Sequence, residues 1–258
     1  IKSMKVVILA GGLGSRLIEK TNIIPKPMVQ IGGKPIIWHI MKYFSHYGYN
    51  EFIICLGYKG EVIKEYFTSY LTNNSDLTIE LKNNKINFHS NHSDDWKVSL
   101  IDTGSKTLTG SRIAKIKKFT KGKRFFLTYG DGLSNIDLKS LLVSHKQSNK
   151  NCTVTAVKPE GRYGVLKFKH NSVQFSEKSS KDVDWVNGGY FVCEQSIFNY
   201  VSEDNNVMWE RNPMEAIAKE NELNAYKHNG FWKAMDTLKD QNELESLWLK
   251  NKAKWKIW

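Results

Sequence analysis

The sequence predicts an α/β protein whose mixed, mostly parallel sheet is flanked by helices and carries a small antiparallel extension. Over the first 150 residues, short apolar runs of strand length alternate with longer amphipathic segments of helical period. This alternation requires crossovers between parallel strands. Over residues 152–193, several strand-like runs follow one another directly, which favours antiparallel pairing.

The elements of the alternating part follow from their apolar patterns. MKVVILA (4–10) predicts a buried strand. PIIWHIMKYFSHYG (35–48) predicts a helix that ends at Gly48, because one face carries Ile36, Ile37, Ile40, Met41 and Phe44. The same criteria predict strands over EFIICLG (51–57) and RFFLTYG (124–130), and helices over GEVIKEYFTSYL (60–71) and DLKSLLVSHKQ (137–147).

Three stretches depart from the alternation. Residues 77–101 predict a hairpin turned at Asn83-Asn84, followed by a further strand. The runs CTVTAVK, GVLKF, SVQFSE and WVNGGYFV within 152–193 predict the antiparallel extension, which can form one wall of a cleft. Residues 238–258 predict a helix whose tryptophans either pack on the body or form a subunit contact.

Composition limits the compartment and the partners. The 258 residues are 40% hydrophobic and 25% charged, and no apolar run approaches the about 20 residues that span a bilayer. The opening apolar run is too short for a secretory signal. The three cysteines lie apart in strand-like contexts, as buried thiols do in a reducing compartment. A cytoplasmic protein without membrane contact is therefore expected, and its net charge of +12 suits a polyanionic ligand.

The segment LAGGLGSR joins the first strand to a glycine-rich turn. Gly11, Gly12 and Gly14 allow close approach of the backbone to an anion, and Arg16 adds a permanently charged fork for phosphate oxygens. The turn matches neither the P-loop nor the dinucleotide pattern. Further along, PKPM places Lys26 between two prolines, which restricts where its side chain points. Two positively charged side chains in restricted positions, Arg16 and Lys26, predict a ligand with several phosphates.

These residues resemble the signature of the nucleotidyltransferases that make sugar nucleotides, a family with a Rossmann-like fold of the GT-A type. The resemblance rests on LAGGLGSRL, PKPM and GGKPIIWHI and spans essentially the whole chain. It implies one domain over 1–258, with a nucleotide-binding half over about 4–150 and a sugar-binding half over about 151–258. It implies that the nucleotide contacts Leu9, Ala10, Gly11, Gly12, Leu13, Gly14, Ser15, Arg16 and Lys26.

The resemblance continues through the later motifs. LTYGDG implies Gly130 at the nucleotide and Asp131 as a magnesium ligand, and FWKAMDT supplies Asp236 as the second metal ligand. FSEK and VNGGYFV imply sugar-binding roles for Glu177, Lys178, Asn187 and Gly188. DTGSKTLTGSR is similar to the segment of the subfamily that uses CTP and glucose 1-phosphate, with Thr107 and Arg112 at the nucleotide. Whether Arg112 contacts base or phosphate stays open, and Thr109 is a further candidate at the base.

The implied reaction converts CTP and a sugar 1-phosphate to a CDP-sugar and pyrophosphate. The attacking phosphate is already deprotonated, so catalysis requires positioning and charge rather than a protein nucleophile. Arg16, Lys26 and Asp131 are the predicted catalytic residues, with Mg²⁺ as cofactor. The resemblance further implies a homo-oligomer, a trimer or hexamer, and a product that feeds dideoxysugar synthesis for surface polysaccharide such as O-antigen.

Alternatives remain at the level of sequence. Ser179 replaces the proline that usually follows the FSEK motif, and GRYGVLKF replaces the more usual GRFGAL. Another sugar 1-phosphate, or UTP or dTTP in place of CTP, is therefore a second hypothesis. A non-catalytic nucleotide- or nucleic-acid-binding module is the third, motivated by the net charge, although no nucleic-acid-binding motif accompanies it.

Overall fold

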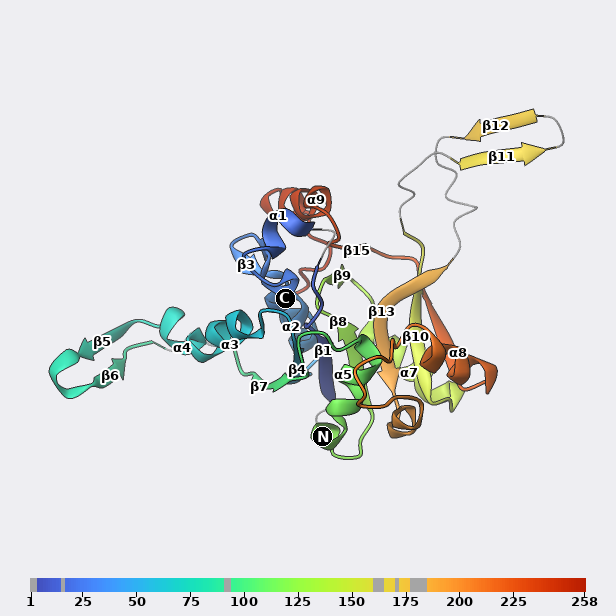
Figure 1. The fold of residues 1–258 in the computed structure, drawn as a ribbon. Coiled ribbons are helices and arrows are strands. Elements are labelled where there is room, and N and C mark those ends of the chain that lie inside the picture. Colours follow the sequence, from blue (N-terminus) through green and yellow to red (C-terminus); the bar gives the residue numbers. More distant parts are fainter. Residues whose placement is uncertain (1–3, 15–16, 91–93, 160–164, 170–171, 177–184) are drawn as a thin grey trace.

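The computed structural model describes residues 4–14, 17–90, 94–159, 165–169, 172–176 and 185–258. Figure 1 shows a sheet at its centre. This sheet has seven strands in the order β14-β10-β13-β8-β1-β4-β7. These strands are β1 (Lys5–Leu9), β4 (Glu51–Leu56), β7 (Lys97–Asp102), β8 (Phe125–Tyr129), β10 (Cys152–Val157), β13 (Val186–Cys193) and β14 (Leu223–His228).

The central sheet is mixed and mostly parallel, which confirms the predicted fold class. β1 pairs in parallel with β4 and β8, β4 pairs in parallel with β7, and β10 pairs in parallel with β14. Only β13 runs against its two neighbours in this sheet, β8 and β10. The carboxyl ends of β1, β4, β7 and β8 therefore meet at one edge, where ligands bind to open α/β sheets.

Helices cover both faces of the sheet. The α-helices are α1 (Ile18–Thr21), α2 (Ile36–His46), α3 (Gly60–Thr68), α4 (Tyr70–Asn73), α5 (Thr109–Lys115), α6 (Lys117–Thr120), α7 (Leu138–Ser148), α8 (Asn212–Lys219) and α9 (Leu238–Leu249). Along β1, Val6 and Ile8 face the core that includes α2, whereas Val7 and Leu9 face the core that includes α5 and α8. This period of two places one apolar layer on each side of the sheet.

The helix predicted over 35–48 shows how closely a periodic pattern fixes an element. Its five apolar positions are all fully buried in α2, and Gly48 follows the helix with a φ of +84°. A left-handed residue at that place ends a helix with the least strain when it is glycine. The predicted helix over 60–71 is instead divided into α3 and α4 at Ser69.

Smaller two-stranded units surround the sheet. They pair β2 (Gln30–Ile31) with β3 (Lys34–Pro35), β5 (Leu77–Glu80) with β6 (Lys85–Phe88), β9 (Gly132–Ser134) with β15 (Trp232–Ala234), and β11 (Val165–Lys169) with β12 (Ser172–Ser176). Short 3₁₀ turns are η2 (Lys26–Met28), η3 (Leu81–Asn83) and η4 (Gln195–Tyr200).

The strands predicted within 152–193 divide into two groups. β11 and β12 form an antiparallel unit, as predicted for the extension. β10 and β13, in contrast, enter the central sheet, because they are buried along almost their whole length and pair with β14 and β8. Strands this apolar need cover on both faces, which a small extension does not provide.

The hairpin over residues 77–88 is confirmed, with Asn84 in the left-handed conformation at its turn. It extends away from the central sheet (Figure 1). The tryptophan-rich tail packs on the body instead. Trp255 is fully buried, and its indole N–H donates to His39 Nδ1 at 3.3 Å.

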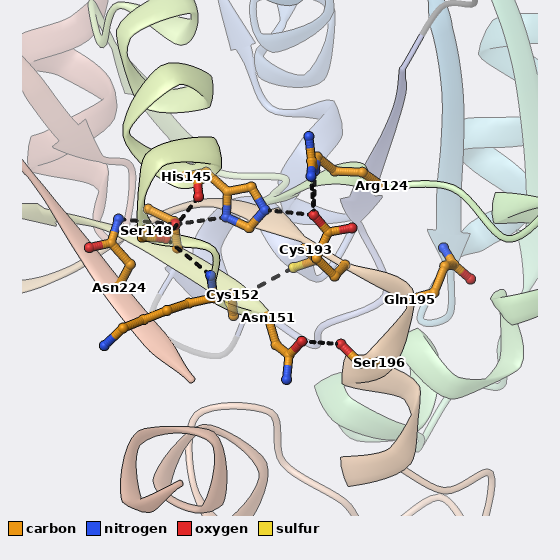
Figure 2. A network of polar contacts seen from close by, with 12 residues as sticks. Arg124, His145, Ser148, Asn151, Cys152, Cys193, Gln195, Ser196 and Asn224 are labelled. Carbon is orange, nitrogen blue, oxygen red and sulfur yellow. Dashed lines mark hydrogen bonds and ion pairs between the residues drawn. The ribbon is translucent and has the colours of Figure 1, made fainter. Parts of the chain in front are cut away.

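A polar network lies at the amino end of β8, away from the carboxyl edge (Figure 2). Arg124 donates to Glu194, whose carboxylate also contacts Nε2 of the buried His145 at 3.1 Å. His145 Nδ1 lies 2.8 Å from the Thr153 hydroxyl. The neighbouring Cys152 and Cys193 are free thiols with their sulfurs 4.0 Å apart. Within the described part of the chain, no helix is both long and apolar enough to cross a membrane.

Candidate active site

The glycine turn leaves β1 at the carboxyl edge of the sheet. Leu9 and Ala10 are buried at the strand end, and the Ala10 N–H donates to the Cys55 carbonyl at 3.0 Å. Gly14 has a φ of +63°, which a side chain rarely tolerates, and a Cβ there would contact Thr21 at 2.7 Å. Leu13 is exposed. Ser15 and Arg16, which were predicted to contact the nucleotide, lie outside the described residues.

Lys26 lies directly against this turn. It begins the 3₁₀ turn η2 between Pro25 and Pro27, and its side chain is buried. A Cβ on Gly14 would lie 3.2 Å from the Lys26 Cβ, so the turn and the lysine are packed together. The prolines fix the backbone φ on either side, which directs the lysine towards the sheet edge.

The Lys26 ammonium joins two aspartates that are far apart in sequence. Its Nζ lies 2.6 Å from Asp131 Oδ2 and 2.8 Å from Asp236 Oδ1. Asp131 follows β8, and Asp236 follows β15. The pairing of β9 with β15 brings them together, and the Met235 N–H donates to the Asp131 carbonyl at 2.9 Å.

The electrostatics of this cluster favour a charged lysine. Burial lowers the pKa of Lys26, but the Asp131 and Asp236 carboxylates outweigh burial, and the pKa is raised overall. One ammonium therefore faces two carboxylates, of which Asp131 also lines a pocket. Oxygen ligands arranged around a single point are also what a hard divalent cation requires.

The pocket beside Asp131 is lined by residues from β8, β13 and β15. Asn187, Gly188 and Tyr129 are among its lining residues, together with Trp232. The Trp232 indole N–H donates to the Gly188 carbonyl at 2.7 Å. A Cβ on Gly188 would lie 2.7 Å from Val157 Cγ1, so this glycine allows β13 to approach β10 closely. The two other predicted sugar residues, Glu177 and Lys178, lie outside the described residues.

Sequence reasoning missed a carboxylate that joins Tyr129, which lines the pocket, to Thr109. Glu210 accepts from the Tyr129 hydroxyl at 2.5 Å and from the Thr109 hydroxyl at 2.7 Å. The Asn187 amide in turn donates to the Tyr129 hydroxyl at 3.3 Å. Tyr129 was detectable as the residue two positions before Asp131, and Trp232 by its place in the FWKAMDT motif. Glu210 lies in a loop before α8, where no pattern marked it.

The remaining predicted nucleotide residues lie around the same edge. The Gly130 N–H donates to the Leu9 carbonyl at 3.0 Å, and a Cβ on Gly130 would lie 3.0 Å from Pro27. Thr107 donates to the Asn205 side chain at 2.9 Å. Arg112 is buried, and its described hydrogen bonds reach protein groups at the ends of three strands, including the Gly11 carbonyl at 2.9 Å.

A glycine turn, a buried lysine and two aspartates meet at the carboxyl edge of parallel strands, where open α/β folds place phosphate-bearing ligands. Residues 5–253 match the model of the nucleotidyl transferase family, and the chain belongs to this family. It is 47% identical over 257 residues to a Salmonella typhimurium protein named glucose-1-phosphate cytidylyltransferase, covering 99% of this chain and 100% of that protein. A Bacillus subtilis protein named probable glucose-1-phosphate cytidylyltransferase is 43% identical over 256 residues, covering 99% of this chain and 100% of that protein.

Among solved structures, apo UDP-glucose pyrophosphorylase aligns with a TM-score of 0.69 at 17% identity, over 97% of this chain and 99% of that one. At this identity the likeness concerns the fold alone. It agrees with the mixed sheet and flanking helices described above.

Proposed function

We propose that the protein transfers the cytidylyl group of CTP to α-D-glucose 1-phosphate, giving CDP-glucose and pyrophosphate. The proposal is supported by full-length identity of 47% and 43% to two proteins named for this activity. The structural observation that carries it is the convergence of Lys26, Asp131 and Asp236 beside the glycine turn. Such a cluster suits the meeting of two polyanionic substrates.

The reaction exchanges one P–O bond for another. A phosphate oxygen of glucose 1-phosphate attacks the α-phosphorus of CTP, and the bond to the β-phosphate oxygen breaks as pyrophosphate leaves. Lys26 is assigned to the α-phosphate, where its charge stabilises the transition state. The N–H groups of the glycine turn and the Arg16 guanidinium are assigned to the rest of the triphosphate. Arg16→Ala is expected to lower turnover roughly 100-fold in a pyrophosphate-release assay.

Mg²⁺ is the proposed cofactor, and the residues present fit it. Asp131 and Asp236 each place a carboxylate oxygen within 2.8 Å of one cation, the Lys26 ammonium, so both carboxylates face a common point. Among the residues that the structure describes, no cluster of three or more His, Cys, Asp or Glu side chains could hold a metal. Two carboxylates, with phosphates and water completing the shell, is the usual protein contribution at Mg²⁺. When bound, Mg²⁺ would neutralise phosphate charge.

The pocket beside Asp131 is the proposed sugar subsite. Asn187 and Gly188 line it and are assigned to the glucose hydroxyls. Glu177 is assigned to the hydroxyls and Lys178 to the sugar phosphate, on the resemblance of the FSEK motif. The whole chain then forms one domain with a nucleotide-binding half over about 4–150 and a sugar-binding half over about 151–258. The facing free thiols of Cys152 and Cys193 support a cytoplasmic location.

The test is a matrix of pyrophosphate release with CTP, UTP, dTTP and GTP against several sugar 1-phosphates. The highest kcat/KM is expected for CTP with glucose 1-phosphate. A preference for UTP or dTTP would overturn the base assignment, and a preference for another sugar would overturn the acceptor. Absence of turnover with every pair, together with salt-sensitive DNA or RNA binding, would favour a binding module instead.

We further propose that the protein is a homo-oligomer, a trimer or hexamer, in which the β5–β6 hairpin contacts a second copy. Leu77 pairs with Phe88 and Ile79 with Ile86, so these four apolar side chains share one face. Thr78, Glu80, Lys85 and Asn87 share the other. Ile79, Ile86 and Phe88 are exposed, and an isolated hairpin is marginally stable in water.

Light scattering coupled to size-exclusion chromatography tests this contact. Ile79→Lys is expected to lower the molar mass towards that of one chain. Thr78→Lys, on the polar face of the same strand, is the matched control and should leave the mass unchanged. A single-chain mass for the unaltered protein, or an unchanged oligomer in Ile79→Lys, would overturn the assignment.

A further inference from the structure

Arg112 occupies an unusual place for a residue in a basic segment. It belongs to the cluster of basic residues between positions 112 and 124, in which a solvated helix face is the ordinary expectation. In the structure only 3% of Arg112 is exposed, although its helix α5 also carries the partly exposed Lys115. Its side chain points from α5 towards the carboxyl ends of the strands.

The Arg112 guanidinium connects three neighbouring strands. Nη1 donates to the Leu56 carbonyl at the end of β4, at 2.9 Å. It also donates to the Thr103 hydroxyl at 2.7 Å and to the Gly104 carbonyl at 2.8 Å, both just after β7. Nη2 donates to the Gly11 carbonyl at 2.9 Å, at the first residue of the glycine turn after β1. Thr103 strengthens this junction, because its hydroxyl donates to the Leu56 carbonyl at 2.6 Å.

Two glycines make room for the guanidinium. A Cβ on Gly11 would lie 2.3 Å from Arg112 Cζ, and a Cβ on Gly57 would lie 2.4 Å from Arg112 Nη1. Neither glycine has a positive φ, so backbone conformation does not account for them. Gly11 and Gly57 instead form two walls of the slot that holds the planar guanidinium. Lysine cannot replace arginine here, because it lacks the fork that reaches several acceptors.

Arg112 in its slot fixes the first residue of the glycine turn, Gly11, and leaves the next residue exposed to open space. The Gly11 carbonyl accepts from Arg112 and also from the Tyr58 N–H at 3.2 Å. One residue further, a Cβ on Gly12 would meet no atom within 4 Å, so the turn faces open space there. Fixing the first residue of a short turn limits the directions in which the following N–H groups can point.

We propose that Arg112 is a positioning residue, which acts through the Gly11 carbonyl to preorganise the glycine turn for the triphosphate of CTP. This inference rests on the proposed function for the identity of the nucleotide. We therefore expect Arg112 to affect nucleotide binding. It makes no described contact with Asn187 or Gly188 in the proposed sugar pocket, so sugar binding should change little. A misplacement of about 1 Å in a binding element can cost roughly 100-fold in rate, so the effect is measurable.

The experiment compares Arg112→Lys, which keeps the charge, with Gly57→Ala, which keeps the arginine but intrudes on its slot. Each variant is expected to raise the KM for CTP roughly 10- to 100-fold and to change the KM for glucose 1-phosphate less than about threefold. In hydrogen exchange without substrates, the Tyr58 amide, which donates to the Gly11 carbonyl, should exchange about 10-fold faster, while the amides of β10 keep their rates. Arg124→Lys is the matched control, because Arg124 pairs with Glu194 at the opposite edge.

Three results would overturn the proposal. They are unchanged exchange at the Tyr58 amide in Arg112→Lys, equal losses for both substrates, or the same CTP effect in Arg124→Lys. If Arg112→Lys does not fold, Gly57→Ala supplies the same three readouts. The exchange measurement needs no turnover, so it separates this proposal from the proposed function. An unaltered protein inactive with CTP would refute the function, while faster exchange at the Tyr58 amide in Arg112→Lys, with unchanged rates in β10, would still support the positioning role.

Discussion

The two edges of the central sheet each carry a cation–carboxylate cluster, but the clusters are built differently. At the carboxyl edge, one ammonium, Lys26, faces the carboxylates of Asp131 and Asp236 beside a pocket. At the amino edge, one carboxylate, Glu194, is shared by Arg124 and the buried His145 (Figure 2). The first cluster has two carboxylates for one ammonium and adjoins the glycine turn, whereas the second has one carboxylate between a guanidinium and an imidazole.

This difference indicates which cluster serves ligands. A carboxylate held by its own partners, as Glu194 is, contributes to packing and stability. Two carboxylates that converge on one cation, as Asp131 and Asp236 do on Lys26, present their oxygens at a common point, and a divalent cation requires the same arrangement. Substitutions at the carboxyl edge are therefore expected to lower activity, and substitutions at the amino edge to lower stability.

The largest effect is expected for Asp131→Asn. It removes one of the two carboxylate charges and should lower turnover by roughly 100-fold or more, because charge stabilisation in the transition state is lost. Pyrophosphate release measures the loss, and the thermal midpoint checks the fold. Asp95→Asn, at an exposed position, is the control. Normal turnover of the folded Asp131→Asn protein would exclude an essential role for this carboxylate.

Much of the carboxyl edge could be predicted from the sequence, for identifiable reasons. The apolar runs predicted β1 and β8, and the residues that follow parallel strands meet at one edge. The motif resemblance then singled out Lys26, Asp131 and Asp236, although their roles as ligands of phosphate and metal stay predictions. Asp236 reaches the site only through the pairing of β9 with β15, which is too short to show a periodic pattern.

Other features could not be predicted because their cause is tertiary. The burial of Arg112 depends on carbonyls at the ends of three strands, which meet only after those strands assemble. β10 and β13 were predicted to belong to the extension, because their own sequences do not show that β14 pairs with β10 and β8 with β13. Glu210 joins Tyr129 to Thr109 across about 80 and 100 residues of chain, without any local signal.

A smaller effect, confined to one substrate, is expected for Gly188→Ala in the pocket. The added Cβ would meet Val157 at 2.7 Å and the Thr155 carbonyl at 3.0 Å, which pushes β13 away from β10. The KM for glucose 1-phosphate should rise roughly 10-fold, with the KM for CTP changed less than about threefold. Val186→Ala, at an exposed position on the same strand, serves as the reference. A change in the KM for CTP alone would contradict the sugar assignment.

At the amino edge, Glu194→Gln should affect stability rather than activity. The substitution removes the charge shared by Arg124 and His145 and is expected to lower the free energy of unfolding by about 1–2 kcal/mol. Urea denaturation followed by tryptophan fluorescence measures the change, and kcat should stay within about twofold of the unaltered protein. A loss of turnover without a loss of stability would contradict the assignment of the amino edge to stability alone.

The smallest effect is the pH dependence at the same edge. Burial lowers the pKa of His145, the Glu194 contact opposes this, and the Arg124 charge adds to the lowering. The folded protein therefore binds fewer protons at this site than the unfolded chain once the pH falls below about 6.5, so stability decreases on acidification. His39, whose pKa burial lowers to about 4, acts in the same direction in every variant. His145→Gln should consequently lose less stability between pH 7.5 and 5.5 than the unaltered protein, and an equal or larger loss would show that His145 is not neutral in the fold.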